Sequence, residues 1–317
     1  GSTVSSNRSD ACDEYDNKGI NHILSSAEVY NPVSQIFTRT SGDLEDARQG
    51  HTATLMESSD QGYLRVESEI GLLFNEIYSN AEGTVSTTIH GIDIDRYAGV
   101  TKLYSPSFTI SNNAETILNI INGNQGSEAR ITIRLYAADG GVLATSQSWL
   151  LPKNAQLKDS LWNLFGKAPS LMNKTGWIEI VSSVDLVVGT VTLKNSADTL
   201  RTAAELSGLP DARFLYPLVS EDSQYQTEIY LMNSGDQTAN AILELWSPEG
   251  DAPVKTVHVT LTPKHQMARF LSDLFPGMDA ISSGNLRIQS DQPLHSLAIL
   301  YSRNLKFMSA MPPVSYP

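Results

Sequence analysis

Six histidines are the side chains of this sequence best suited to chemistry, but they lack the spacing that a metal site needs. No two of them stand as close together as the ligands of a zinc motif. We therefore expect them on strand or loop surfaces, and His258, which alternates with Val257 and Val259, should face solvent. The six are His22, His51, His90, His258, His265 and His295.

The sequence contains no Gly-x-Ser-x-Gly, no His-Glu-x-x-His and no Walker motif. Neither a nucleophile elbow, a metalloprotease helix nor a phosphate-binding loop is therefore indicated. We predict that the protein is not an enzyme and that it has no catalytic, cofactor-binding or metal-binding residues. No pocket should bring histidine, carboxylate and thiol groups together with strongly shifted pKa values.

Two acidic segments offer the hard oxygen ligands that calcium prefers. One is His90–Asp95, with carboxylates at Asp93 and Asp95. The other has Leu24 where the EF-hand spacing counted from Asp13 would require a bidentate acid. We interpret both as solvated acidic loops and predict no cofactor. The second segment consists of Asp10, Asp13, Glu14, Asp16 and Asn17, followed by Gly19.

The single cysteine, Cys12, cannot close an internal disulfide, and the polar segment Ser9–Gly19 around it is expected to be exposed. A paired disulfide framework is excluded. An intermolecular disulfide and a lipid attachment both remain open for this thiol.

Length and composition indicate a protein of strands and turns with several cores. The chain has 317 residues, 40% of them hydrophobic and only 18% charged, with 21 Gly and 14 Pro, which suits two or three separately packed domains. The net charge of −13, with no run of Lys or Arg, argues against a nucleic-acid partner. No apolar stretch is long enough to span a membrane and no export signal is present, while the Gly1 start suggests a cut chain.

An internal repeat with an offset close to 110 residues is the most informative signal. Residues 104–165 align with residues 216–275, and the strands beginning at Gly176 and Gly284 correspond as well. Within this alignment the matching segments are Tyr104–Pro106 with Tyr216–Leu218, Ile117–Asn124 with Ile229–Asp236, Leu135–Gly140 with Leu245–Gly250, and Leu151–Lys153 with Thr262–Lys264.

A third copy of the closing element, Gly62–Glu69, comes earlier and belongs to a repeat that lacks its opening strands. The predicted organisation is a polar N-terminal segment (1–19), an incomplete first repeat (20–103), a second repeat (104–215) and a third repeat (216–317). Residues 197–215 are expected to act mainly as the connection between the last two.

Each repeat has the pattern of antiparallel β-sheet. Ile131, Ile133 and Leu135 are separated by polar residues, the period of two that a strand with one buried face requires. The only helix-like pieces are Leu161–Phe165 and Leu271–Phe275, expected to form a turn or two that plugs one end of the core. The predicted fold class is all-β, with tandem antiparallel β-sandwiches of which the first is incomplete.

Two resemblances follow from these motifs. The two-copy region resembles the Ig-like β-sandwich repeats that occur in tandem in large secreted or surface-attached bacterial proteins; this resemblance implies a scaffold and specifies no active site. Residues 24–56 are similar to a kelch blade of galactose-oxidase-like propellers. One blade cannot form a propeller, so we interpret this kelch-like stretch as the middle strands of the first repeat, with a truncated propeller as the alternative.

We therefore expect an extracellular structural or adhesive protein, secreted or at the cell surface. Its partner would be another copy of the chain or a cell-surface molecule, and the unpaired edge of the first repeat would accept a strand from residues 1–19 or from the tail after Met308 of a neighbour, giving a filament. The alternative is a carbohydrate-binding or adhesin module of a larger secreted enzyme. Three tryptophans could stack on sugars in that case, although core packing is the preferred interpretation: Trp162, Trp177 and Trp246.

Overall fold

The computed structural model describes residues 90–314 with their side chains and, ahead of them, the backbone of short strands between residues 13 and 90. The chain divides into two compact units, residues 1–73 and 74–317. Within the described residues, no helix has the length and apolar character needed to cross a bilayer.

The strands of the N-terminal part form antiparallel pairs. Strands β1 and β2, β3 and β4, and β5 and β6 pair within the first unit, whereas β7 pairs with β8 in the second. The predicted acidic cluster and Cys12 lie in this part, and their side chains are outside the described residues, as is most of the kelch-like stretch. The bounds are β1 Asp13–Tyr15, β2 Asn21–Ile23, β3 Glu28–Asn31, β4 Ile36–Arg39, β5 Thr52–Ala53, β6 Val66–Glu67, β7 Asn75–Ser79 and β8 Ser86–His90.

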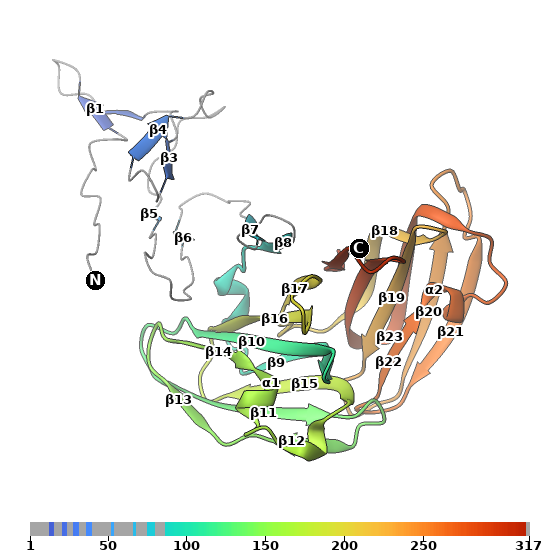
Figure 1. The fold of residues 1–317 in the computed structure, drawn as a ribbon, viewed down its shortest axis with the longest axis horizontal. Coiled ribbons are helices and arrows are strands. Elements are labelled where there is room, and N and C mark those ends of the chain that lie inside the picture. Colours follow the sequence, from blue (N-terminus) through green and yellow to red (C-terminus); the bar gives the residue numbers. More distant parts are fainter. Residues whose placement is uncertain are drawn as a thin grey trace. The chain divides into compact units, whose positions relative to one another are not determined.

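The first large sheet, drawn in green to yellow in Figure 1, has nine antiparallel strands in the order β12-β11-β15-β9-β10-β16-β17, with β13 paired to β11 and β14 to β10. The 3₁₀ turn η2 (Ile94–Tyr97) precedes it. Its elements are β9 Lys102–Ile110, β10 Ala114–Asn122, β11 Ala129–Tyr136, β12 Val142–Thr145, β13 Trp149–Leu151, β14 Gln156–Ser160, α1 Leu161–Leu164, η3 Pro169–Leu171, β15 Lys174–Ser182, β16 Val187–Asn195 and β17 Arg201–Glu205.

The second large sheet, drawn in yellow to red, has seven antiparallel strands in the order β21-β20-β23-β18-β19-β22, with β24 paired to β23. Strand β23 is 22 residues long and pairs with β18 through its first part and with β19 through its second, while β18 also pairs with β19. This ring of pairings makes the sheet nearly a barrel. Its elements are β18 Asp211–Glu221, β19 Tyr225–Met232, β20 Ala239–Trp246, β21 Lys255–Leu261, β22 Gln266–Phe270, α2 Leu271–Leu274, β23 Ile281–Ser302 and β24 Met308–Met311.

Each sheet folds around its own apolar core because its strands alternate. Ile131, Ile133 and Leu135 on β11 are fully buried, and β20 repeats the pattern. The helices α1 and α2 are single turns whose leucines enter these cores, as expected for the two helix-like segments. The prediction of an all-β protein with antiparallel sheets is confirmed.

The internal repeat of the sequence also appears in the strand register. On β11 and β15, Tyr136 lies opposite Trp177, and on β20 and β23, Trp246 lies opposite Asn285. Gly176 lies beside the first of these pairs and leaves no room for a side chain, because a Cβ there would meet the Tyr136 oxygen at 1.9 Å. The two sheets therefore share strand order and register in this region, while side chains on their outward faces differ.

In three of the four matching segments the sequence alignment is wrong by one residue, because the strand register matches Tyr104 with Leu215 and Leu151 with Leu261. The alignment also set Asn122 over Ser234, but Asn122 and Asn233 make the same hydrogen bonds: each Nδ2 donates to three carbonyl oxygens of the neighbouring loops. These acceptors are Ser127, Leu151 and Pro152 for Asn122, and Gln237, Leu261 and Thr262 for Asn233.

The segment expected to act mainly as a connection, residues 197–215, is largely sheet. It contains β17, which pairs with β16, and the first residues of β18, which pair with β23. Only residues 206–210 separate the two strands, so the connection between the two sheets is short.

Candidate functional site

The two large sheets meet along a junction that the repeat pattern of the sequence does not reveal. An aromatic cluster lies at its centre, made of Tyr104, Trp177 and Met232, which are at most 8% exposed, with Tyr136 packed beside them. The Tyr136 and Trp177 rings stack at 3.9 Å with an interplanar angle of 2°. The Trp177 Nε1 donates to the Lys264 carbonyl oxygen at 3.0 Å, so this tryptophan of the first sheet hydrogen-bonds to the second.

Gln266, the first residue of β22, fixes the junction through its backbone and its side chain. Its amide N donates to the Ala138 oxygen at 2.9 Å. Its Nε2 donates to the Pro106 oxygen and lies 3.4 Å from the Gly176 oxygen. One glutamine of the second sheet therefore contacts three carbonyl groups of the first.

His295 is buried in the same junction, with 1% of its surface exposed. Its Nδ1 lies 2.9 Å from Ser207 Oγ and its Nε2 lies 3.2 Å from Ser234 Oγ, while the Tyr104 ring packs against it at 4.5 Å. Burial lowers the pKa of His295 to about 3, so the imidazole is neutral at physiological pH. The expectation that all six histidines occupy surface positions is wrong for His295.

A second polar centre surrounds Glu179, whose carboxylate is buried on the outward face of β15. Arg134 Nη1 donates to it at 2.9 Å, and the hydroxyls of Tyr136 and Tyr104 lie at 3.2 and 3.4 Å. The Lys102 ammonium is 3.7 Å away. A buried carboxylate with two cations and two phenols is satisfied, which is the arrangement of a structural ion pair rather than of a catalytic base.

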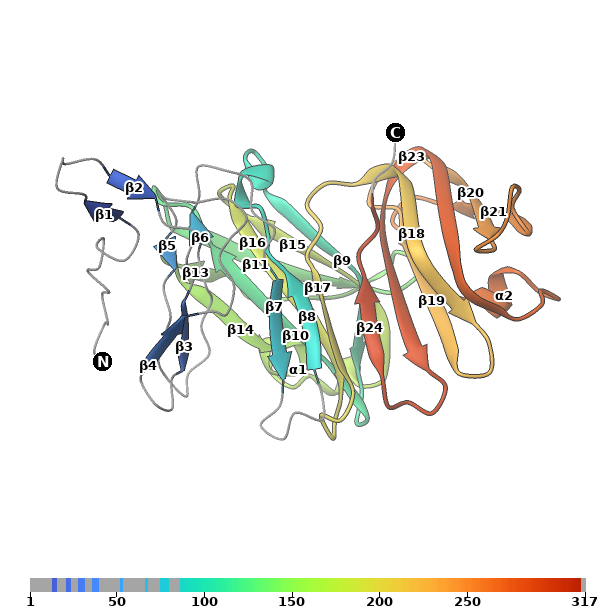
Figure 2. The same cartoon turned by 90° about the horizontal axis from the view of Figure 1, so that it is seen from above.

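An apolar contact completes the junction where β24 lies beside β17 (Figure 2). Met308, Ile299 and Leu297 of the second sheet are buried there against the first. The Ala310 amide N donates to Thr202 Oγ1 across the same contact. The contributing side chains of the first sheet are Leu193, Leu200 and Ala204.

Beside the junction lies a groove of about 700 Å³ that both sheets line. The carboxylate among its described lining residues is Glu228, whose Oε2 accepts hydrogen bonds from Tyr230 at 2.6 Å and from Tyr301 at 3.2 Å. Burial raises the pKa of Glu228, and these two hydrogen bonds partly oppose the shift. The other polar lining groups include Thr109, Thr175, Thr260, Thr262, His265 and Arg269.

The groups that line the groove can hydrogen-bond to a polar ligand. Hydrolysis of a glycosidic bond needs two carboxyl groups across the bond, and Glu228 is the only carboxylate among the described residues that line it. What the groove offers is a carboxylate, a guanidinium, hydroxyls and the ring of Tyr301.

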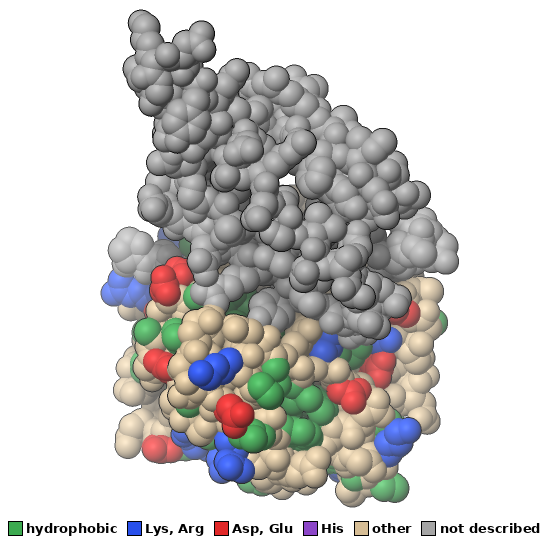
Figure 3. Space-filling model, turned by 90° about the vertical axis from the view of Figure 1, so that its left-hand side faces the viewer, with side chains coloured by type: hydrophobic (Ala, Val, Ile, Leu, Met, Phe, Trp, Pro, Cys, Tyr) green, Lys and Arg blue, Asp and Glu red, His purple; other side chains and the backbone are tan. Residues whose placement is uncertain are grey.

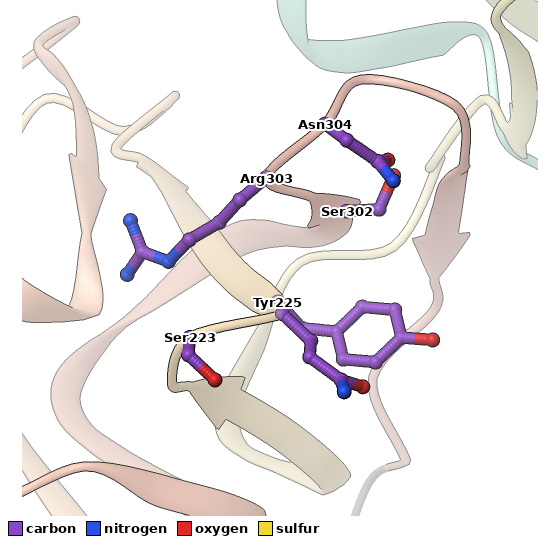
Figure 4. A pocket seen from close by; sticks show the side chains of 6 residues that line it. Ser223, Tyr225, Ser302, Arg303 and Asn304 are labelled. Carbon is purple, nitrogen blue, oxygen red and sulfur yellow. The ribbon is translucent and has the colours of Figure 1, made fainter.

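A smaller pocket of about 300 Å³ lies between the β18–β19 turn and the end of β23. Arg303 is the one cation among the described residues that line it, but its guanidinium bonds to Glu221, the Asp222 oxygen and Gln226. Figure 4 shows the Arg303 and Tyr225 side chains directed away from each other. This pocket therefore brings no reactive groups together.

The remaining predicted candidates stay apart. His90 and His258 are exposed, and Asp93 accepts a hydrogen bond from the Asp95 amide at 3.2 Å as the cap of η2. Among the residues described with side chains, no three His, Cys, Asp or Glu side chains gather where they could hold a metal ion. On the face shown in Figure 3, the described charges of both signs are scattered.

Two of the three tryptophans considered for sugar stacking pack as the preferred interpretation expected. Trp177 is buried in the junction and Trp162 packs against the core of the first sheet. Trp246 is half-buried on the outward face of the second sheet, and the Arg287 guanidinium lies over its ring at 4.1 Å. Sequence reasoning missed the junction because these outward positions look like surface positions in either repeat alone.

No family model and no curated protein matches this chain. Among solved structures, one that is similar is titled "Crystal Structure of Thermotoga maritima 1070", with 15% sequence identity and a TM-score of 0.29. The match covers 34% of this chain and 96% of that chain. A likeness this distant carries no argument about function.

Proposed function

We propose that the protein is an extracellular structural or adhesive protein, secreted or held at the cell surface, built from tandem Ig-like β-sandwich repeats of which the first is incomplete. The observation that supports this proposal is the junction. Trp177, Gln266 and His295 hold the two sheets to each other through an aromatic cluster and hydrogen bonds. An apolar, hydrogen-bonded interface between tandem domains restricts their relative motion and so keeps a fixed spacing, whereas domains with small polar contacts move relative to each other.

The fixed spacing can be measured with spin labels. In a Cys12→Ser background, cysteines replacing Lys158 on β14 and Ser272 on α2, both exposed, would carry the labels. We expect one narrow distance distribution by pulsed electron paramagnetic resonance. A broad distribution in the otherwise unchanged chain would contradict the proposal.

The two equivalent glutamines supply a matched control for this measurement. Gln266→Ala removes the side-chain contacts across the junction and should broaden the distribution. Gln156→Ala changes the equivalent first residue of β14, whose side chain bonds to Asn119 within its own sheet. That variant should leave the distribution narrow.

A second candidate function is saccharide binding in the groove beside the junction. Supporting it are the hydroxyls, the Tyr301 ring and the Glu228 carboxylate that line this groove, since sugars are bound by such polar groups together with aromatic faces. Binding of the chain to a glycan array, lost in Tyr301→Ala and retained in Tyr225→Ala, would support it. An array without any binding would remove this candidate.

A further inference from the structure

The outward face of the second sheet is equivalent to the face of the first sheet that the junction covers. In both sheets this face is formed by the side chains of three strands that point away from the core. The strand pairing shows which positions of the two sheets correspond. Tyr104 makes an isolated bridge to Ser207, and Leu215 makes the same bridge to Val314. We name as the outer face of the second sheet the residues Leu215, Pro217, Leu218, Trp246, Asn285 and Arg287.

On the first sheet most of the equivalent positions are buried, whereas those of the second sheet are half-buried or exposed; Tyr136 and Trp246 are half-buried in both. Trp177 is 1% exposed and Ser107 4% exposed. Leu218, one position beyond the Pro217 that matches Pro106, is 41% exposed. The position that is covered on the first sheet is therefore open to solvent on the second.

Two polar atoms on the outer face also lack partners. Trp246 Nε1 and Asn285 Oδ1 are buried and have no hydrogen bond within the described part of the chain. In the first sheet, the tryptophan of the same cross-strand pair donates from Trp177 Nε1 to the Lys264 carbonyl of the neighbouring sheet. A buried donor without a hydrogen-bond partner is destabilising, so binding of a carbonyl supplied from outside would be favourable.

Lys264, whose carbonyl accepts this hydrogen bond at the internal junction, has a counterpart in the first sheet. Lys264 and Asn154 both have a left-handed backbone, with φ of 64° and 57°. Gln266 and Gln156 are the first residues of β22 and β14 and pair with Met232 and Ile121 respectively. The loop Pro152–Gln156 therefore has the same backbone turn and the same glutamine as the loop that docks on the first sheet, and its residues 152–154 are exposed.

We propose that the outer face of the second sheet binds the loop Pro152–Gln156 of a second copy of this chain, repeating the internal junction between molecules. Gln156 would then exchange its bond to Asn119 for bonds to the carbonyls of Pro217 and Gly284, as Gln266 bonds to those of Pro106 and Gly176. Arg287, whose long side chain lies over Trp246, is the group that turns aside to admit the loop. Loop and face are different surfaces, so the contact is heterologous and copies add head to tail. This inference rests on the proposed structural function and specifies how copies join.

Site-directed cross-linking tests the contact. The variant Cys12→Ser with Asn154→Cys and Asn285→Cys, treated at micromolar concentration with a short bismaleimide, should give a ladder of covalent oligomers on a denaturing gel. A mixture of the two single-cysteine variants should stop at dimers. The matched control carries Val142→Cys and Val254→Cys, which are 60% and 51% exposed in the parent chain and belong to neither the loop nor the outer face.

Each outcome decides the inference. A ladder in the test pair that exceeds the control pair supports it. Monomers only, or cross-linking of the Asn285→Cys variant with itself, would overturn it, because the second result means a face-to-face dimer. Neither result alters the spin-label distance within one chain, so a failed contact between copies is distinguishable from a failed structural function.

Discussion

Acid should destabilise the protein through His295, and the size of the effect follows from its burial. The folded-state pKa is about 3, below the unfolded value of 6.5. The unfolded chain therefore binds the proton more readily at any pH between these values, and the stability that the neutral imidazole provides is complete above pH 6.5 and is lost as the pH falls toward 3. Each unit of pKa difference corresponds to about 1.4 kcal/mol.

The expected loss in the free energy of unfolding is about 2 kcal/mol between pH 7.5 and pH 5. His295→Gln has no titrating group but can still hydrogen-bond to Ser207 and Ser234. Urea unfolding of both proteins at several pH values isolates the histidine, because the shifts of other groups, such as the raised pKa of Glu228, are common to both and cancel in the difference.

The difference between the two unfolding free energies should therefore shrink as the pH falls from 7.5 to 5. His258→Gln is the control for the substitution itself, because His258 lies exposed on β21. Parallel curves for the parent and His295→Gln would refute the reasoning. So would an NMR titration in which the His295 ring protonates near pH 6.

Three further changes test the packing by thermal or urea unfolding. Gly176→Ala should cost several kcal/mol, because its Cβ would meet the Tyr136 oxygen at 1.9 Å, whereas Gly166→Ala, with φ of 64° and no atom within 4 Å, should cost only about 1 kcal/mol. Equal costs would contradict the steric argument. Asn122→Ala and Asn233→Ala should each lose about 1 to 3 kcal/mol, since each removes three side-chain hydrogen bonds, one of them to a buried carbonyl; a neutral result for one of them would show that the two are not equivalent. Leu161→Ala and Leu271→Ala should each cost about 2 to 5 kcal/mol, and an exposed-position change such as Leu150→Ala should stay within about 0.5 kcal/mol.

The inward half of the fold could be predicted from the sequence because it depends on local alternation. Ile131 and Ile133 were expected in a core and are fully buried, and both helix-like segments form a single turn. The repeat alignment failed where it had only similar residue types to follow. Asn122 resembles both Asn233 and Ser234, and only the hydrogen bonds to the following loops separate the two choices. A shift of one residue matters because it exchanges the two faces of a strand.

The outward half could not be predicted from one repeat. His295 follows Leu294, which points into the core of the second sheet, so alternation places the histidine outside that core. It is buried only because the first sheet covers it, and no pattern within residues 216–317 contains that neighbour. The same holds for Trp177, whose partner Lys264 lies 87 residues further along the chain.

The differences between the repeats therefore carry more information about function than their similarities. Arg134 and Glu179 form an opposite-charge pair across β11 and β15, and Glu244 and Arg287 form the reversed pair across β20 and β23. Either order suits two neighbouring strands, so the sheet itself does not explain the exchange. In the first sheet the member of the pair on β15 is Glu179, whose carboxylate accepts hydrogen bonds from Tyr104 and Arg134. In the second sheet the same position holds Arg287, which leans over Trp246 on an open face. The order of the charges therefore differs with what covers the face and not with the strand pairing. Comparing the outward side chains position by position in this way locates the surface on which a second copy would bind.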